Sequence, residues 1–107
     1  MRITFENEIV RGVCEDYELT FEKYGNDRAT LLLGRISDIE AASCIEDIKI
    51  GRFVIIELTN IKVVINYYFS HQDDQYMTFE APQDDNLSIN YHSYKKISRV
   101  KLTKITL

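Results

Sequence analysis

The chain has 107 residues with 17 acidic and 13 basic side chains, and its formal net charge of −4 argues against a general nucleic-acid binder. This length supports one hydrophobic core, hence a single domain over residues 1–107. No export signal follows Met1 and no apolar run approaches about 18 residues, so we expect a cytoplasmic protein without a membrane span, with Cys14 and Cys44 as free thiols.

A short strand and a first helix are predicted at the N-terminus. Residues 2–5 alternate polar and apolar side chains over a length that suits only a short strand. The apolar spacing then becomes helical, which predicts a helix over residues 8–23 with Asn7 as its N-cap. The residues at helical spacing are Val10, Val13, Cys14, Tyr17, Phe21 and Tyr24.

The clearest amphipathic pattern predicts a second helix, which begins after Gly25 with Asn26 as its N-cap. No Gly or Pro follows Ala42, so the helix is expected to fray into a turn near Glu46. Its apolar stripe consists of Ala29, Leu32, Leu33, Ile36, Ile39 and Ser43. The connection between the two helices is tight, which predicts an antiparallel helical hairpin.

Leu31 lies about 140° from the centre of this stripe, on the side that carries Arg35. One interpretation is that a neighbouring helix packs there, or that Leu31 is an ordinary exposed apolar residue. The other is that Leu31 and Arg35 bind a partner protein.

β-branched and aromatic residues dominate the second half of the chain. They predict three strands at residues 53–58, 62–69 and 75–80, joined as an antiparallel meander, with Pro82 ending the third. A polar loop then reaches about Lys96. In the last strand Val100 and Leu102 share one parity and Ile105 has the other, which predicts a bulge near Thr103. The fold class is therefore α+β, with the helical hairpin packed on an antiparallel sheet of four to five strands.

Charge is divided unequally along the chain. Residues 1–85 contain all 17 acidic groups and 8 basic ones, whereas residues 86–107 contain five basic groups and no acidic group. Such a division is typical of a phosphate-binding surface, or of a terminal strand whose lysines protect an exposed sheet edge.

The order and spacing of several short motifs resemble the RelE/ParE toxin superfamily, in particular its HigB-like plasmid maintenance system killer branch. The matching pieces span nearly the whole chain: VCEDYELTFEKYG from Val13, RISDIEAA from Arg35, IEDI from Ile45, Gly51-Arg52, Glu57-Leu58 and TFEAP from Thr78. The resemblance implies a toxin of a type II toxin–antitoxin system that cuts messenger RNA on the ribosome and is neutralised by an antitoxin protein.

The residues that the resemblance assigns to catalysis are only partly present. In place of a Lys-rich turn after Glu57-Leu58, this chain has Lys62 as the only cation, and Tyr76 stands where an arginine is usual. A C-terminal Tyr or His has no counterpart. Lys62 and Tyr76 are therefore the candidate catalytic residues of an incomplete set, while Arg52, Arg99 and Lys101 are the candidate RNA-binding residues.

Each candidate also has a simpler interpretation. Lys62 and Arg52 could be solvated strand ends, Tyr76 a packing residue, and Arg99 and Lys101 protection of a sheet edge. The turn with His71, Asp73 and Asp74 suggests a metal site, but hairpin tips are usually polar, and we expect neither a metal nor a cofactor.

Two functions from different classes remain open at this point. One is the toxin, with an antitoxin, the ribosome and messenger RNA as partners. The other is a non-enzymatic interaction module, such as an immunity or neutralising protein or a decayed toxin homologue, for which the acidity and the spare apolar side of the second helix suffice. A homodimer is compatible with both.

Overall fold

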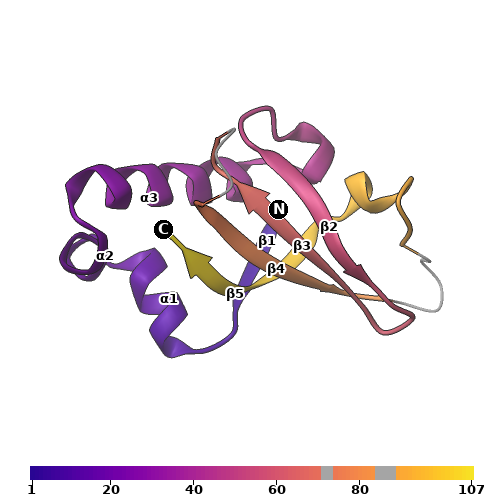
Figure 1. Cartoon of the computed structure of the whole chain (residues 1–107), viewed down its shortest axis with the longest axis horizontal. Helices are drawn as coiled ribbons and strands as arrows, with labels where there is room; N and C mark the ends of the chain where they lie inside the picture. The colour runs from indigo at the N-terminus through magenta and orange to yellow at the C-terminus, as the bar shows by residue number, and fades with distance from the viewer. Residues whose placement is uncertain (71–73, 84–88) are drawn as a thin grey trace.

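The computed structural model describes residues 1–70, 74–83 and 89–107, which form an α+β fold with the helices grouped on one face of a sheet (Figure 1). The elements in chain order are β1 (Arg2–Phe5), α1 (Glu8–Glu15), α2 (Tyr17–Tyr24), α3 (Asn26–Ala41), the 3₁₀ helix η1 (Ile45–Asp47), β2 (Arg52–Leu58), β3 (Lys62–Tyr68), β4 (Tyr76–Pro82), the 3₁₀ helix η2 (Tyr94–Lys96) and β5 (Arg99–Thr106).

The sheet has five strands in the order β1-β5-β4-β3-β2. The strands β2, β3, β4 and β5 are antiparallel neighbours, which confirms the predicted meander, whereas β1 lies parallel to β5. The sheet is therefore mixed rather than purely antiparallel. Because β1 pairs with residues 99–102 of β5, Arg99 and Lys101 do not lie on a sheet edge.

The predicted bulge in the last strand is confirmed. Phe79 pairs with Leu102 and Thr78 pairs with Lys104, so Thr103 is the extra residue. Its hydroxyl donates to the carbonyl of Thr78 at 3.1 Å. The bulge restores Ile105 to the face that Leu102 occupies, and this keeps both apolar side chains on the core side of the sheet.

The predicted first helix is two helices, because Asp16 interrupts it. Asp16 is extended, with φ −114° and ψ 107°, and its carboxylate accepts from the N–H groups of Glu18 and Leu19. It therefore ends α1 and caps α2. The buried Thr20 hydroxyl then donates to the carbonyls of Val13 and Asp16, which ties the two helices together.

The prediction of Asn26 as the N-cap of the following helix was wrong. Gly25 occupies the cap position of α3 with φ +82°, a left-handed conformation that favours glycine. Asn26 is the first helical residue, and its side chain accepts from the Tyr17 hydroxyl at 2.7 Å. At the other end, α3 stops at Ala41 and η1 follows, which matches the predicted fraying and leaves Ser43 exposed outside the helix.

The core lies between α3 and the sheet. The apolar stripe of α3 supplies buried Leu32, Ile36 and Ile39, which pack against alternate residues of the central strands. Those strand residues are Val63, Ile65, Tyr67, Met77, Phe79 and Leu102. Within the described ranges 1–70, 74–83 and 89–107, no helix has the length and apolar character needed to cross a membrane.

Candidate functional site

The side chains of interest lie on the face of the sheet opposite the helices, which we call the open face. Since Val63, Ile65 and Tyr67 point into the core, Lys62 and Tyr68 of the same strand point the other way. Cross-strand pairing extends this face over the sheet. All five residues predicted for catalysis or RNA binding belong to it: Arg52, Lys62, Tyr76, Arg99 and Lys101.

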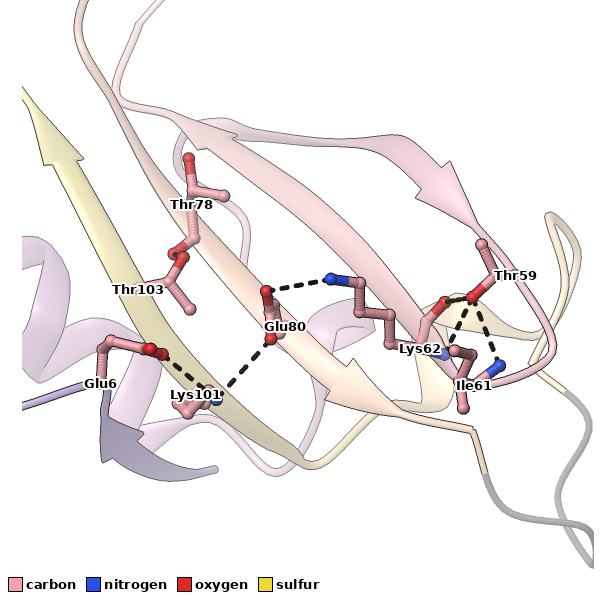
Figure 2. A network of polar contacts seen from close by, with 8 residues as sticks. All are labelled: Glu6, Thr59, Ile61, Lys62, Thr78, Glu80, Lys101 and Thr103. Atoms are coloured by element: carbon pink, nitrogen blue, oxygen red, sulfur yellow. Dashed lines mark hydrogen bonds and ion pairs between the residues drawn. The ribbon is translucent and has the colours of Figure 1, made fainter.

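Glu80, at the centre of the open face, holds two of these residues (Figure 2). Its carboxylate lies 3.6 Å from the Lys62 Nζ and 3.7 Å from the Lys101 Nζ. Lys101 also lies 3.1 Å from the Glu6 carboxylate, and this bond and charge raise the pKa of Lys101 above its usual value. Both lysine side chains remain 42% exposed, so an incoming anion can reach them.

The turn before β3 positions Lys62. The Thr59 hydroxyl accepts from the N–H groups of Ile61 and Lys62 at 3.3 and 3.2 Å, and it donates to the Lys62 carbonyl at 3.2 Å (Figure 2). The hydroxyl therefore pairs backbone N–H and C=O groups that a tight turn would otherwise leave without a hydrogen-bond partner. The Lys62 backbone is therefore fixed where its ammonium group meets Glu80.

A second group of polar and aromatic side chains lies at the opposite ends of the strands. The guanidinium of Arg52 stacks 4.4 Å from the ring centroid of Tyr68, whose ring lies 5.3 Å from that of Tyr76. The Tyr68 hydroxyl accepts from the buried Asn66 amide at 3.2 Å, and the Asn66 oxygen accepts from Thr78 at 2.8 Å. This arrangement offers aromatic surface and a cation, the features that bind unpaired bases.

The two predicted catalytic residues are not brought together. Tyr76 pairs with Tyr68, and Tyr68 is six positions from Lys62 along β3, a span of about 20 Å at the rise of an extended strand. Groups that act on one phosphate must lie within hydrogen-bond reach of it. Lys62 and Lys101 have a common ion-pair partner in Glu80, which the sequence analysis did not suggest. The three residues come together only through the pairing of β3, β4 and β5.

A hollow of about 320 Å³ borders this centre, between β1, β5 and β4, and is lined by Glu80, Lys101, Arg99 and Arg2 among others. Arg2 and Arg99 are exposed and lie directly opposite each other on parallel strands. Arg2 is a second residue that the sequence did not suggest, because its proximity to Arg99 comes from the pairing of the chain's two ends.

No family model, curated protein or solved structure matches the sequence. The structure itself establishes an α+β fold in which helices are followed by a five-stranded mixed sheet.

The residues predicted to bind a partner lie on α3, away from the open face. Leu31 is partly buried and packs against the core, which agrees with the packing interpretation of its position. The Arg35 Nη1 lies 3.5 Å from the Asp38 carboxylate, and the Arg35 side chain is 23% exposed. These two side chains therefore offer little free apolar surface.

The predicted metal turn falls partly outside the described residues, since His71 and Asp73 belong to the range 71–73. In the part of the chain that the structure describes, no group of three or more His, Cys, Asp or Glu side chains could hold a metal ion.

Proposed function

We propose that the chain is a toxin-family protein of a type II toxin–antitoxin system, similar to RelE/ParE toxins of the HigB-like branch, and that it binds RNA on the open face. One observation carries the proposal: residues chosen from separate parts of the sequence, Arg52, Lys62, Tyr76, Arg99 and Lys101, lie on one face of the sheet. A face with cations along one side and aromatic rings on the other suits single-stranded RNA, since phosphates and bases need these two kinds of group.

The chemistry available on the open face supports cleavage centred on Glu80. When the ribose 2′-hydroxyl attacks the phosphate, the bond from phosphorus to the 5′-oxygen breaks. The reaction needs a base to accept the 2′-hydroxyl proton, cations to stabilise the charge on the phosphate, and a donor that protonates the leaving 5′-oxygen. Glu80 supplies a carboxylate as the base, and Lys62 and Lys101 supply two ammonium groups beside it, one of which can donate the proton to the leaving oxygen. Tyr76 is too distant to act on the same phosphate, so its proposed role is base stacking.

The proposal is tested by RNA binding of the Arg99→Ala/Lys101→Ala double variant. A fluorescein-labelled single-stranded RNA is titrated at several salt concentrations. Losing two phosphate contacts should weaken binding and reduce the slope of log K against log salt by about 1.4, or about 0.7 per contact. The control is Arg28→Ala/Lys95→Ala, which removes one Arg and one Lys, both exposed, from the helix α3 and from η2. Equal behaviour of the two double variants would refute the open-face site.

A cellular experiment tests the toxin assignment itself. The chain is expressed by induction in a bacterial host with the neighbouring gene absent and then restored. Growth arrest that the neighbour relieves is the expected result, and it should disappear in the Glu80→Gln variant. Harmless expression of the wild-type chain would contradict the assignment to an active toxin.

A non-enzymatic interaction module is the second candidate, because exposed apolar residues gather on the first two helices. Ile9, Tyr17, Leu19 and Phe21 are each at least 46% exposed. RNA-independent capture of a partner, together with harmless expression, would favour this function.

A further inference from the structure

The helices α1 and α2 enclose an apolar groove that the RNA-binding proposal does not use. It has a volume of about 460 Å³, and its apolar lining is Ile9, Gly12, Val13 and Leu19. Ile9 is 75% exposed and Leu19 is 46% exposed. A smaller hollow of about 60 Å³ shares Ile9 and Val13 and extends the groove toward Ile105 at the end of β5. Large aliphatic side chains left open beside a hollow mark an interaction surface.

The shape of the groove is fixed by the break at Asp16. The buried Thr20 hydroxyl joins α2 to the Val13 carbonyl of α1, so the angle between the helices is set by an internal bond rather than by a partner. At Gly12 an added Cβ would lie 3.5 Å from the Leu19 side chain, which is ordinary contact distance. The absence of a side chain there keeps this part of the groove open.

The charges around the groove select the occupant. From Glu8 to Tyr24 the chain has five acidic residues and two basic ones, a net charge of −3. Of the two basic groups, Arg11 lies 4.0 Å from Glu15. The other, Lys23, lines the groove beside Glu8 and Glu22, so the lining itself keeps one excess negative charge. A second copy would bring the same negative surface against this one, and an anionic membrane would be repelled as well. A positively charged partner is attracted.

We propose that this groove binds a basic, amphipathic helix of a partner protein. Aliphatic side chains spaced three or four residues apart would occupy the space between Ile9 and Leu19, and flanking Lys or Arg residues would face the acidic rim. Glu8 and Glu22 line the groove together with Lys23, and the two carboxylates are the partners for those cations. This inference rests on the groove alone and does not depend on the RNA-binding proposal.

The test uses two synthetic peptides of about 14 residues, long enough for roughly four helical turns. Both carry leucines at helical spacing; one has lysines and the other has glutamates at the remaining positions. Binding to the full chain is measured by fluorescence anisotropy with each peptide labelled. The lysine peptide should bind, and the glutamate peptide should bind at least about tenfold more weakly.

Three variants assign the binding site. Ile9→Asp should weaken binding of the lysine peptide by about tenfold or more, because it removes the burial of one large aliphatic side chain. Glu22→Lys should weaken binding of the same peptide because it replaces an attractive charge with a repulsive one. The matched control is Ile61→Asp, because Ile61 is 73% exposed but lies in the turn between β2 and β3, and this change should have no effect. The wild-type chain and the three variants are checked for an intact fold by circular dichroism.

Several results would overturn the inference. If Ile9→Asp and Ile61→Asp weaken peptide binding equally, the peptide adsorbs nonspecifically. If the lysine and glutamate peptides bind with equal affinity, the acidic groups do not select a basic partner. Self-association of the wild-type chain that Ile9→Asp abolishes, measured by analytical ultracentrifugation, would assign the groove to a second copy instead. Arg99→Ala/Lys101→Ala should leave peptide binding unchanged, so failure of the RNA proposal and failure of this one are separable.

Discussion

Replacing Glu80 by glutamine tests whether this carboxylate competes with RNA for the two lysines beside it. The substitution keeps the size of the side chain and removes one negative charge that lies 3.6 Å from the Lys62 Nζ and 3.7 Å from the Lys101 Nζ. Exposed ion pairs of this kind contribute little to the free energy of unfolding, so the variant should remain folded. Lys62 becomes available to a phosphate group, whereas Lys101 still pairs with Glu6, and binding of single-stranded RNA should tighten.

The magnitude follows from the number of cations released. Lys101 retains Glu6 as a partner at 3.1 Å, so the variant releases Lys62 alone. One added phosphate contact on a single strand steepens the slope of log K against log salt by about 0.7. Between 50 and 200 mM salt, a slope change of this size makes the gain in affinity about 2.6-fold larger at the lower salt concentration.

The assay is an anisotropy titration with a labelled RNA oligonucleotide at five or so salt concentrations. Glu18→Gln is the control, because it removes the same charge from an exposed position on α2. If Glu80→Gln and Glu18→Gln change the slope equally, the effect is one of net charge, and the reasoning about Glu80 is wrong. Tighter RNA binding combined with loss of growth arrest would identify Glu80 as the base in cleavage.

Four further outcomes concern the stability of the fold and the reactivity of its two thiols. Gly51→Ala should lower the free energy of unfolding by about 2–4 kcal/mol in urea denaturation, because Gly51 has φ +81° and a Cβ would overlap the buried Tyr67 ring. Asp16→Ala should cost about 1 kcal/mol in the same assay by removing the N-cap of α2. Burial raises the pKa of the Cys14 thiol from 9.0 to about 12, so alkylation at pH 8 followed by mass spectrometry should modify Cys44 and spare Cys14. The same shift contributes stability that is complete below pH 9 and is lost as the pH rises toward 12, and Cys14→Ala should reduce this loss.

Local pattern predicted those features of the fold that depend on neighbouring residues. The change of parity between Leu102 and Ile105 predicted the bulge at Thr103, because apolar side chains must stay on one face of the sheet. The meander was predicted from the short turns that separate three runs of β-branched and aromatic residues. The break at Asp16 was missed because the apolar residues on both sides of it keep helical spacing, while the decisive interaction is the polar cap that Asp16 provides to α2.

Features that depend on distant pairing could not be predicted from local pattern. The parallel alignment of β1 with β5 joins the two ends of the chain, and nothing in the four residues of β1 indicates it. The role of Glu80 likewise requires the register of β3, β4 and β5 together. For this reason the sequence suggested the lysines of the open face but not the carboxylate between them.

The position of β5 bears on the basic C-terminal part of the chain, for which edge protection and phosphate binding were both open interpretations. Because residues 99–102 of β5 lie between β1 and β4, Arg99 and Lys101 do not protect an exposed edge, so that interpretation of these two residues is wrong. Lys101 is compensated by Glu6 and Glu80, whereas in the described part of the chain no ion pair involves Arg99 or its neighbour Arg2. Like charges on paired strands are destabilising. An anionic ligand that bridges the two guanidinium groups would offset that repulsion, which is why the pair supports phosphate binding at this side of the open face.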